Sequence, residues 1–532
     1  MTISRSRGHV YCPRLVASNA IRVHHSDTTA PPKRYGRADR RRTHRAEPLV
    51  HSLGEAIVVN RVVGTLALGA FGITAALVVA TLALSLGPIS NAAHGGQPQA
   101  RTVRVSNTSA VLQPLPTHWY SWGYGPSHDS VFAGAARPQP GTAFSTRVGV
   151  SAIPDQPSVV GNLLFVGTDG GTVAAIDRHT GQVVWKVRLA NQVMSTPLVH
   201  AGTILLGVGN KIFATPAPPG YKRLRGTGWS GIVALSETTG RVLWSVRTTG
   251  EVMPTLAYWD GNAYAATGGG HLWAVQAATG IVEWKLRLAG FDSMSSPAVF
   301  GGILYVGSGG AVFAVDLQAR RVLWHTAMPT VSGLSDCSPT VNANDEYIDA
   351  ITSLTDTGGH TAQATEVMFA LSRATGSIVW QRAVGNGTIA PDQMQTGVPA
   401  LYGRLLYFGS PVTKAVYALN AGDGQLIWQF RALGQVRGAP ALVGGEVVTL
   451  DSSGYVDALR ATTGKLVASH RLSQGLSLNT KTMFPTGFGP ASPTVIGQMV
   501  YAASMDGHVY AFPLTDLLNN TWASTPWPDS KS

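Results

Sequence analysis

The sequence predicts an all-β fold, an eight-bladed β-propeller preceded by one transmembrane helix. The first observation is a repeated phrase, in which an Ala is followed six positions later by Gly and ten positions later by Trp. Its period of roughly 40 to 60 residues indicates supersecondary units that pack against one another. The second is that each unit holds four short stretches rich in β-branched and aromatic residues. The third is an uncharged apolar run over residues 62–87, which predicts the helix.

The repeated phrase supplies a structural blade motif of one glycine and one tryptophan. Its pairs are Gly181 and Trp185, Gly240 and Trp244, Gly280 and Trp284, Gly376 and Trp380, and Gly424 and Trp428. In another copy Arg320 replaces the glycine before Trp324, and in the seventh Ala468 replaces the tryptophan. Glycine permits the positive φ of a tight turn, and we expect the tryptophan to wedge between neighbouring blades.

The last repeat has only three clear strands, at 494–496, 499–503 and 509–512. A closed ring hides its sheet edges, so a segment ahead of the first repeat is expected to supply the missing strand. Thr142–Val150 is the candidate. Trp119 and Trp122 are expected to pack beneath it.

The formal charge of +12 comes mainly from the N-terminal segment rather than from the repeats. Residues 1–61 are read as a basic, disordered cytoplasmic arm, 62–87 as the helix, 88–116 as a linker, 117–525 as the propeller and 526–532 as a tail. Because basic residues gather before the apolar run, the N-terminus is expected in the bacterial cytoplasm and the propeller outside, held to the cell membrane by a single pass. A cleaved signal peptide, with Ser90-Asn91-Ala92 as its site, is the alternative. No nucleic-acid partner is expected.

The repeats resemble those of the pyrroloquinoline-quinone (PQQ) β-propeller superfamily over about residues 117–522. Ala175-Ile176-Asp177, followed by Thr180-Gly181 and Trp185, is the fullest copy. The resemblance implies an eight-bladed propeller of PQQ-repeat type. The superfamily includes quinoprotein dehydrogenases as well as propellers that bind no cofactor.

The motifs that quinoprotein alcohol dehydrogenases use for chemistry do not match this sequence. Such enzymes carry two adjacent cysteines and oxygen ligands for Ca²⁺, whereas Cys12 and Cys337 are the two cysteines here. No catalytic residue, metal site or cofactor is therefore expected. The alternative is a PQQ-dependent quinoprotein dehydrogenase that oxidises an alcohol or sugar, with PQQ and Ca²⁺ as cofactors.

The longest connections are predicted to emerge on one face of the propeller. They lie at 210–231 and 352–366 within repeats and at 380–399 and 468–493 between repeats. Loops carry binding on such scaffolds, so a protein partner is expected on this long-connection face. Lys222, Arg223, Arg225 and Trp229 form its candidate partner-binding loop, which could also be a solvated loop with one anchoring tryptophan.

Side chains three positions before each strand-opening proline are expected at the mouth of the central funnel. The candidate ligand-binding residues there are Met194, Glu251, Met294, Asp336, Thr396 and Arg437. The alternative is that they are hydrated funnel residues without a ligand.

The sequence therefore predicts a membrane-anchored extracytoplasmic propeller that acts as a protein- or ligand-binding scaffold. A sensor that couples an external ligand to the cytoplasmic arm is a further reading.

Overall fold

The computed structural model describes residues 128, 131–132, 143–209, 228–288, 290, 294–328, 331–332, 334–356, 362–389, 396–472 and 487–519. These residues lie in one compact unit, Val105–Ser532. The predicted arm, transmembrane helix and linker, together with Trp119 and Trp122, lie outside the described residues. Among the helices that are described, none is long and apolar enough to cross a membrane.

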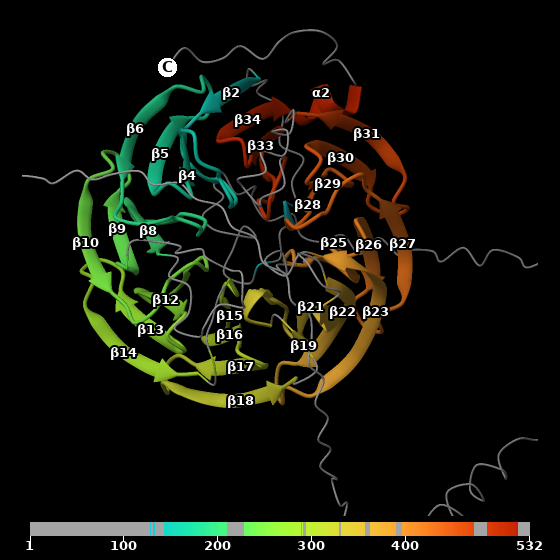
Figure 1. Ribbon diagram of the computed structural model, residues 1–532, viewed down its shortest axis with the longest axis horizontal. Coiled ribbons are helices and arrows are strands. Elements are labelled where there is room, and N and C mark those ends of the chain that lie inside the picture. Colours follow the sequence, from blue (N-terminus) through green and yellow to red (C-terminus); the bar gives the residue numbers. More distant parts are fainter. Residues whose placement is uncertain are drawn as a thin grey trace, which may run out of the picture. The chain divides into compact units, whose positions relative to one another are not determined.

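Eight sheets are arranged in a ring, which confirms the eight-bladed propeller (Figure 1). From the innermost strand outward, blade one is β3 (Ser158–Val160), β4 (Leu163–Gly167), β5 (Thr172–Asp177) and β6 (Val183–Arg188). Blade two is β7 (Leu198–His200), β8 (Thr203–Val208), β9 (Gly231–Ser236) and β10 (Val242–Arg247). Blade three is β11 (Ala257–Trp259), β12 (Asn262–Thr267), β13 (His271–Gln276) and β14 (Val282–Arg287). Blade four is β15 (Ala298–Phe300), β16 (Ile303–Ser308), β17 (Ala311–Asp316) and β18 (Arg321–Ala327).

The second half of the ring departs further from the repeat. Blade five contains β19 (Val331–Ser332), the 3-10 turn η1 (Leu334–Asp336), β20 (Thr340–Val341), β21 (Asp345–Asp356), β22 (Ala362–Ser372) and β23 (Ile378–Ile389). Blade six is β24 (Ala400–Tyr402), β25 (Leu405–Ser410), β26 (Ala415–Asn420) and β27 (Leu426–Arg431). Blade seven is β28 (Ala441–Val443), β29 (Glu446–Leu450), β30 (Tyr455–Arg460) and β31 (Leu466–Arg471), joined by β1 (Val131–Phe132). Blade eight is β32 (Thr494–Ile496), β33 (Met499–Ala503), β34 (His508–Pro513) and β2 (Phe144–Arg147), and α2 (Leu514–Asn519) follows it.

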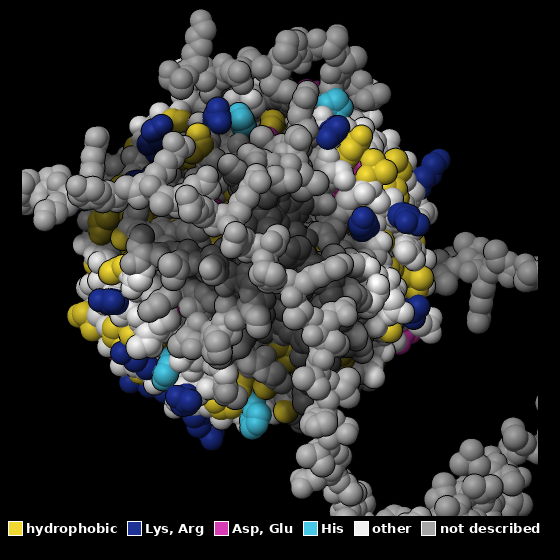
Figure 2. All heavy atoms as spheres, viewed as in Figure 1, with side chains coloured by type: hydrophobic (Ala, Val, Ile, Leu, Met, Phe, Trp, Pro, Cys, Tyr) yellow, Lys and Arg dark blue, Asp and Glu magenta, His cyan; other side chains and the backbone are white. Residues whose placement is uncertain are grey.

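Burial explains why the middle strands of each blade read as apolar runs and the outer strands alternate. In β5 four consecutive residues are buried, because both faces of the blade pack on neighbouring blades. In β6 exposed and half-buried residues alternate, with charged side chains toward solvent. Cationic side chains of the outer strands lie around the rim of the ring (Figure 2): Lys186, Arg188, Arg247, Lys285, Arg287, Arg431 and Arg471. Such charges protect a free sheet edge from pairing with another chain.

The motif tryptophans join each blade to the next. Their Nε1 atoms donate to carbonyl oxygens of the following blade: Trp185 to Glu237 (3.0 Å), Trp244 to Ala277 (3.1 Å), Trp324 to Arg373 (2.8 Å), Trp380 to Ala421 (2.9 Å) and Trp428 to Ala461 (2.8 Å). A Cβ added to Gly424 would lie 2.6 Å from the Trp380 ring, and Gly424 has a φ of +70°. Glycine is thus required both by the turn and by the approach of the indole.

An N-terminal strand closes the ring, as the sequence predicts for Thr142–Val150. β2 pairs antiparallel with β34, with Phe144 opposite Ala511. Phe144 occupies the place of the missing tryptophan, since a Cβ on Gly181 would lie 2.6 Å from its ring. Thr146 Oγ1 donates to the Gly181 carbonyl at 2.6 Å. Closure therefore removes the open edge of blade eight.

A second N-terminal segment lies at the inner edge of the ring, which the sequence did not predict. His128 Nδ1 lies 3.0 Å from the Pro339 carbonyl oxygen, and Thr340 Oγ1 donates to the His128 carbonyl at 3.0 Å. Three residues later β1 pairs in parallel with β28, with Val131 opposite Leu442. The segment thus connects the innermost strands of blades five and seven.

Candidate binding face

Blade five differs from the others in the length of its strands. β21, β22 and β23 have 12, 11 and 12 residues, whereas their counterparts in blade one have 5 or 6. Much of the expected loop at 352–366, and the first part of the one at 380–399, is therefore strand. The sequence signal is an alternation of small and polar residues through 362–365, which continues the strand period of two.

A buried carboxylate joins this extension to blade six. Glu366 is fully buried, and its Oε2 accepts hydrogen bonds from the Ser410 hydroxyl and, at 3.4 Å, from the Val412 amide. Ala364 and Ile389 pack on Val412. The extension is thus a rigid part of the long-connection face rather than an unattached loop.

The predicted funnel residues occupy the approach to the innermost strands. Met194, Met294, Asp336, Thr396 and Arg437 each lie four residues before the first residue of β7, β15, β20, β24 and β28. Glu251 lies six residues before β11, because Pro254 is three residues from the strand whereas the other prolines directly precede theirs. Met253 holds the equivalent position in blade three.

Burial separates the predicted funnel residues into two groups. Glu251, Thr396 and Arg437 are 2–3% exposed, and Met294 is 8% exposed. Met194 and Asp336 are half-buried. The carboxyl of Glu251 rests against the backbone of Gly268, where an added Cβ would lie 2.3 Å from its Cδ. Four of these side chains are therefore packed into the inner wall, whereas Met194 and Asp336 are partly exposed there.

Hydroxyl groups link the innermost segments of neighbouring blades. Backbone amides donate to hydroxyls one blade further on: Thr196 to Thr255 (2.9 Å), Thr255 to Ser296 (3.0 Å), Ser296 to Ser338 (2.8 Å) and Ala439 to Ser492 (2.7 Å). The strand-opening prolines take part as well, because their carbonyls accept hydroxyl protons; Thr494 Oγ1 donates to Pro157 at 2.6 Å. These bonds hold the inner wall in register.

Asp155 is an ionisable group of this inner wall that sequence reasoning missed. Burial raises its pKa to about 6, although hydrogen bonds from Thr196, Gln156 and Thr255 act in the opposite direction. The Gln156 amide donates to Oδ1 at 2.8 Å. A carboxyl with this pKa can accept or release a proton near neutral pH. Its signal in the sequence is weak, since a single Asp before a proline-containing turn is common.

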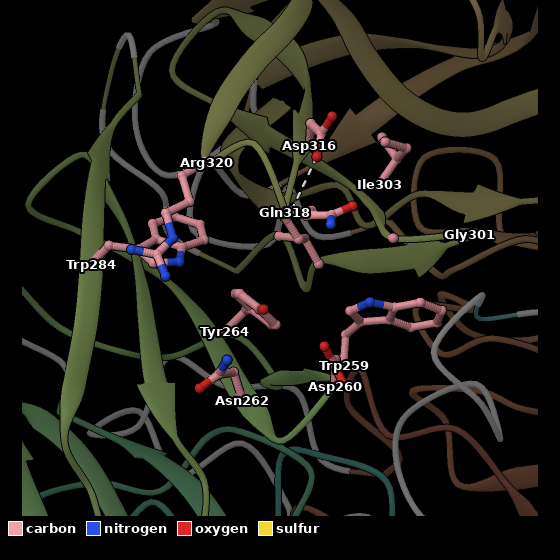
Figure 3. Close-up of a pocket in the computed structure, with 12 residues that line it drawn as sticks. Trp259, Asp260, Asn262, Tyr264, Trp284, Gly301, Ile303, Asp316, Gln318 and Arg320 are labelled. Atoms are coloured by element: carbon pink, nitrogen blue, oxygen red, sulfur yellow. Dashed lines mark hydrogen bonds between the residues drawn. The ribbon is translucent and has the colours of Figure 1, made fainter.

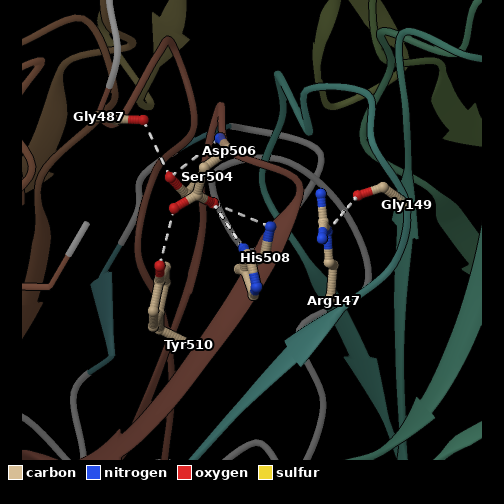
Figure 4. Close-up of polar contacts among 7 residues, drawn as sticks. All are labelled: Arg147, Gly149, Gly487, Ser504, Asp506, His508 and Tyr510. Carbon is tan, nitrogen blue, oxygen red and sulfur yellow. Dashed lines mark hydrogen bonds and ion pairs between the residues drawn. The ribbon is translucent and has the colours of Figure 1, made fainter. Parts of the chain in front are cut away.

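A polar cluster lies at the turn between β33 and β34 on the long-connection face (Figure 4). Asp506 accepts from the Tyr510 hydroxyl at 2.8 Å and from the His508 amide at 3.0 Å, and His508 Nδ1 lies 3.2 Å away. Although burial opposes it, these hydrogen bonds lower the pKa of Asp506 to about 2. Asp506 is therefore a fixed negative charge, and its hydrogen bonds organise the turn.

The predicted partner-binding loop is only partly within the described residues. Lys222, Arg223 and Arg225 lie outside them. Trp229 is half-buried against the core between blades one and two, and its carbonyl accepts from Asn191 Nδ2 at 2.8 Å. Trp229 thus anchors the end of the loop.

Two features of the described residues bear on a PQQ–Ca²⁺ site of the dehydrogenase type. Within the described ranges, no three His, Cys, Asp or Glu side chains gather where they could hold a metal ion. Cys337 is a single buried thiol, and it has no neighbouring cysteine in the sequence. Eight sheets of four or five strands, with a Gly–Trp contact at five of their junctions, define a propeller whose repeats resemble the PQQ type.

Comparisons with known proteins agree with this class. The family model for outer membrane protein assembly factor BamB matches residues 136–217 and 220–357. Tetrathionate hydrolase of Acidithiobacillus ferrooxidans is 27% identical over 375 residues, which cover 67% of this chain and 72% of that protein. Outer membrane protein assembly factor BamB of Yersinia pestis is 24% identical over 387 residues, covering 70% of this chain and 88% of that protein.

The fold is also shared with a solved enzyme structure. Quinohemoprotein alcohol dehydrogenase from Comamonas testosteroni superposes with a TM-score of 0.53 at 14% identity, covering 78% of this chain and 82% of that one. The chain therefore shares the propeller fold of these proteins, and its repeats resemble those of the PQQ-like β-propellers.

Proposed function

We propose that this protein is a binding propeller, held outside the cytoplasmic membrane by the apolar segment 62–87, that presents its long-connection face to a protein partner. The observation that carries the proposal is the extension of blade five, fixed to blade six by Glu366. Strand β23 is partly exposed along this extension, and a surface that is already held in place binds a partner at a lower ordering cost. The match to outer membrane protein assembly factor BamB of Yersinia pestis covers 88% of that protein, and this similarity supports a scaffold role.

Site-specific photo-crosslinking in intact cells tests this proposal. A photoreactive residue at Thr388, exposed on the extension, is expected to form a discrete adduct. Tyr402 is 49% exposed at the turn between β24 and β25, on the opposite face, and the same residue placed there is the matched control. Adducts of equal yield at both positions, or at neither, contradict the proposed face. Protease added outside spheroplasts should digest the propeller, and its protection would contradict the proposed topology.

We further propose that binding requires no cofactor. The purified protein mixed with PQQ and Ca²⁺ should show neither stoichiometric quinone binding nor dye-linked oxidation of alcohols and aldoses. Turnover with bound quinone would establish the dehydrogenase alternative instead.

A second candidate function is hydrolysis of tetrathionate, favoured by the 27% identity to tetrathionate hydrolase over two-thirds of the chain. Asp155 is, with Asp457, a described carboxyl whose pKa is raised to about 6, which suits proton transfer to or from water or a leaving sulfur group. Incubation of the full chain with tetrathionate between pH 3 and pH 7 should then release thiosulfate. Asp155→Asn should abolish release while leaving the thermal unfolding transition in place. Absence of release at every pH removes this candidate.

A further inference from the structure

The junction between blades three and four lacks the contact that seals its neighbours. Arg320, with a φ of +56°, stands where the other blades have the motif glycine. A Cβ at the corresponding Gly280 would lie 2.7 Å from the Trp244 ring, so a side chain at position 320 keeps the Trp284 indole from approaching this turn as closely, although it packs on Tyr264 of its own blade as the other motif tryptophans do. Among the described residues, Trp284 Nε1 makes no hydrogen bond to the following blade like those of the other five motif tryptophans.

The result is a pocket of about 510 Å³ between β11–β12 of blade three and the turns of blade four (Figure 3). At the next junction an arginine occupies the equivalent space. There Arg373 lies over the Phe300 ring at 4.3 Å, and Trp324 donates to the Arg373 carbonyl. In blade four the residue equivalent to Arg373 is Leu317, which is buried in the core below. The pocket is within the ~300–1,000 Å³ range of small-molecule sites.

Flat apolar surfaces and mixed hydrogen-bonding groups face each other across this pocket. Trp259 is 37% exposed, and its indole lies over the backbone of Gly302, 3.7 Å from the position of an added Cβ. Tyr264 and Trp284 form the opposite side, with ring centroids 5.8 Å apart. Asp260, Asn262 and Gln318 line the space between (Figure 3). The pocket therefore offers one exposed indole, Trp259, a half-buried one, Trp284, and, between them, amide donors and carboxylate and amide acceptors.

The charged side chains around the pocket restrict the classes of ligand that it can bind. The Arg320 guanidinium is 4.0 Å from the Glu283 carboxylate, so its charge is balanced nearby. Asp260 and Asp316 also line the pocket, which disfavours an anion. A quaternary ammonium ion would leave the amide donors unused, and a purely apolar ligand would leave every polar group without a partner. A neutral ligand with a flat C–H face and many hydroxyl groups satisfies both the rings and the polar side chains.

We propose that this pocket binds a saccharide, with a sugar ring stacked on Trp259 and its hydroxyl groups hydrogen-bonded to Asp260, Asn262 and Gln318. The site lies on the face opposite the long-connection face, so the inference goes beyond the proposed function. The sugar is either free or part of an envelope polysaccharide, and both present the same ring chemistry.

The test uses the full chain and three soluble probes: maltotriose, tri-N-acetylchitotriose and tetramethylammonium. Saturable quenching of tryptophan fluorescence by at least one saccharide is expected, with a Kd of roughly 1–10 mM. Trp259→Ala should weaken binding at least tenfold. Tyr402→Ala removes an exposed aromatic side chain from the equivalent position of blade six and should leave the Kd unchanged. Retention of the wild type, but not of Trp259→Ala, on insoluble peptidoglycan would identify the wall polysaccharide as the source, and binding of soluble sugar alone would identify a free one.

Two variants of Arg320 show whether binding depends on the open space between the blades or on the guanidinium group. Arg320→Gly restores the motif, lets Trp284 dock and should abolish saccharide binding while the protein remains folded. Arg320→Asn keeps a Cβ and tolerates the positive φ, so binding should persist. No saturable binding of either saccharide, equal binding by Trp259→Ala and wild type, or preference for tetramethylammonium would each overturn the proposal.

Discussion

Gly424→Ala should destabilise the propeller far more than an alanine at an open glycine. The new Cβ would lie 2.6 Å from Trp380 Cε3, and the residue would keep a φ of +70°. The left-handed conformation costs roughly 1–2 kcal/mol for a non-glycine residue. Displacing the indole adds about 1–3 kcal/mol of overpacking, and weakening the 2.9 Å bond from Trp380 Nε1 to the Ala421 carbonyl adds about 1 kcal/mol. The free energy of unfolding should therefore fall by about 3–6 kcal/mol.

Gly403→Ala is the matched control, because Gly403 also has a positive φ, +58°, but has no atom within 4 Å of an added Cβ. Gly403→Ala should lower the free energy of unfolding only by the cost of the left-handed backbone conformation, roughly 1–2 kcal/mol. Urea unfolding of both variants gives the difference. Repeating Gly424→Ala in a Trp380→Ala background closes a double-mutant cycle, in which the alanine should cost no more than it does at Gly403. Equal losses at Gly424 and Gly403 in the presence of Trp380 would refute the reasoning, since the indole would then move aside without cost.

Three further changes have expected outcomes. Burial raises the pKa of Asp457 to about 6 from 3.8, so its contribution to stability is complete below about pH 4 and is lost as the pH rises through 6. Asp457→Asn should then resist urea better than the wild type at pH 7, by at most about 3 kcal/mol, but not at pH 4; a gain at both pH values would contradict the titration. Glu366→Ala removes the acceptor of Ser410 and should speed amide hydrogen exchange at 362–366, whereas Glu366→Gln should restore part of the protection; unchanged exchange would mean that the extension does not depend on this contact. Phe144→Ala should cost about 3–5 kcal/mol in urea unfolding and loosen the closure of blade eight, and a loss below 1 kcal/mol would exclude Phe144 as a blade wedge.

The sequence predicts the fold well because each blade repeats a local rule. A strand period of two, a turn glycine and a tryptophan act within about 40 residues, and eight copies reinforce one another. The closing strand at Phe144 could be predicted as well, because an open sheet edge demands a partner. β1 could not be, since two residues with no period carry no signal of pairing with β28. The offset of Glu251 has a similar cause, because the distance from Pro254 to its strand is set by blade packing and not by the repeat.

The most informative residues for function are those where the chain departs from its own repeat. Arg320 breaks the Gly–Trp contact at a single junction, and a pocket opens there. The strands of blade five are longer than their counterparts, and the buried Glu366 attaches the added length to blade six. Ala468 also lacks the tryptophan, but α2 contacts β31, and Leu514 and Leu517 fill the core beside it. At Ala468 other side chains occupy the space of the missing tryptophan, so that change is structural. The pocket beside Arg320, in contrast, remains accessible to solvent. Whether other side chains occupy the space left by a changed motif residue distinguishes, at each junction between blades, a closed contact from a site that is available to a ligand.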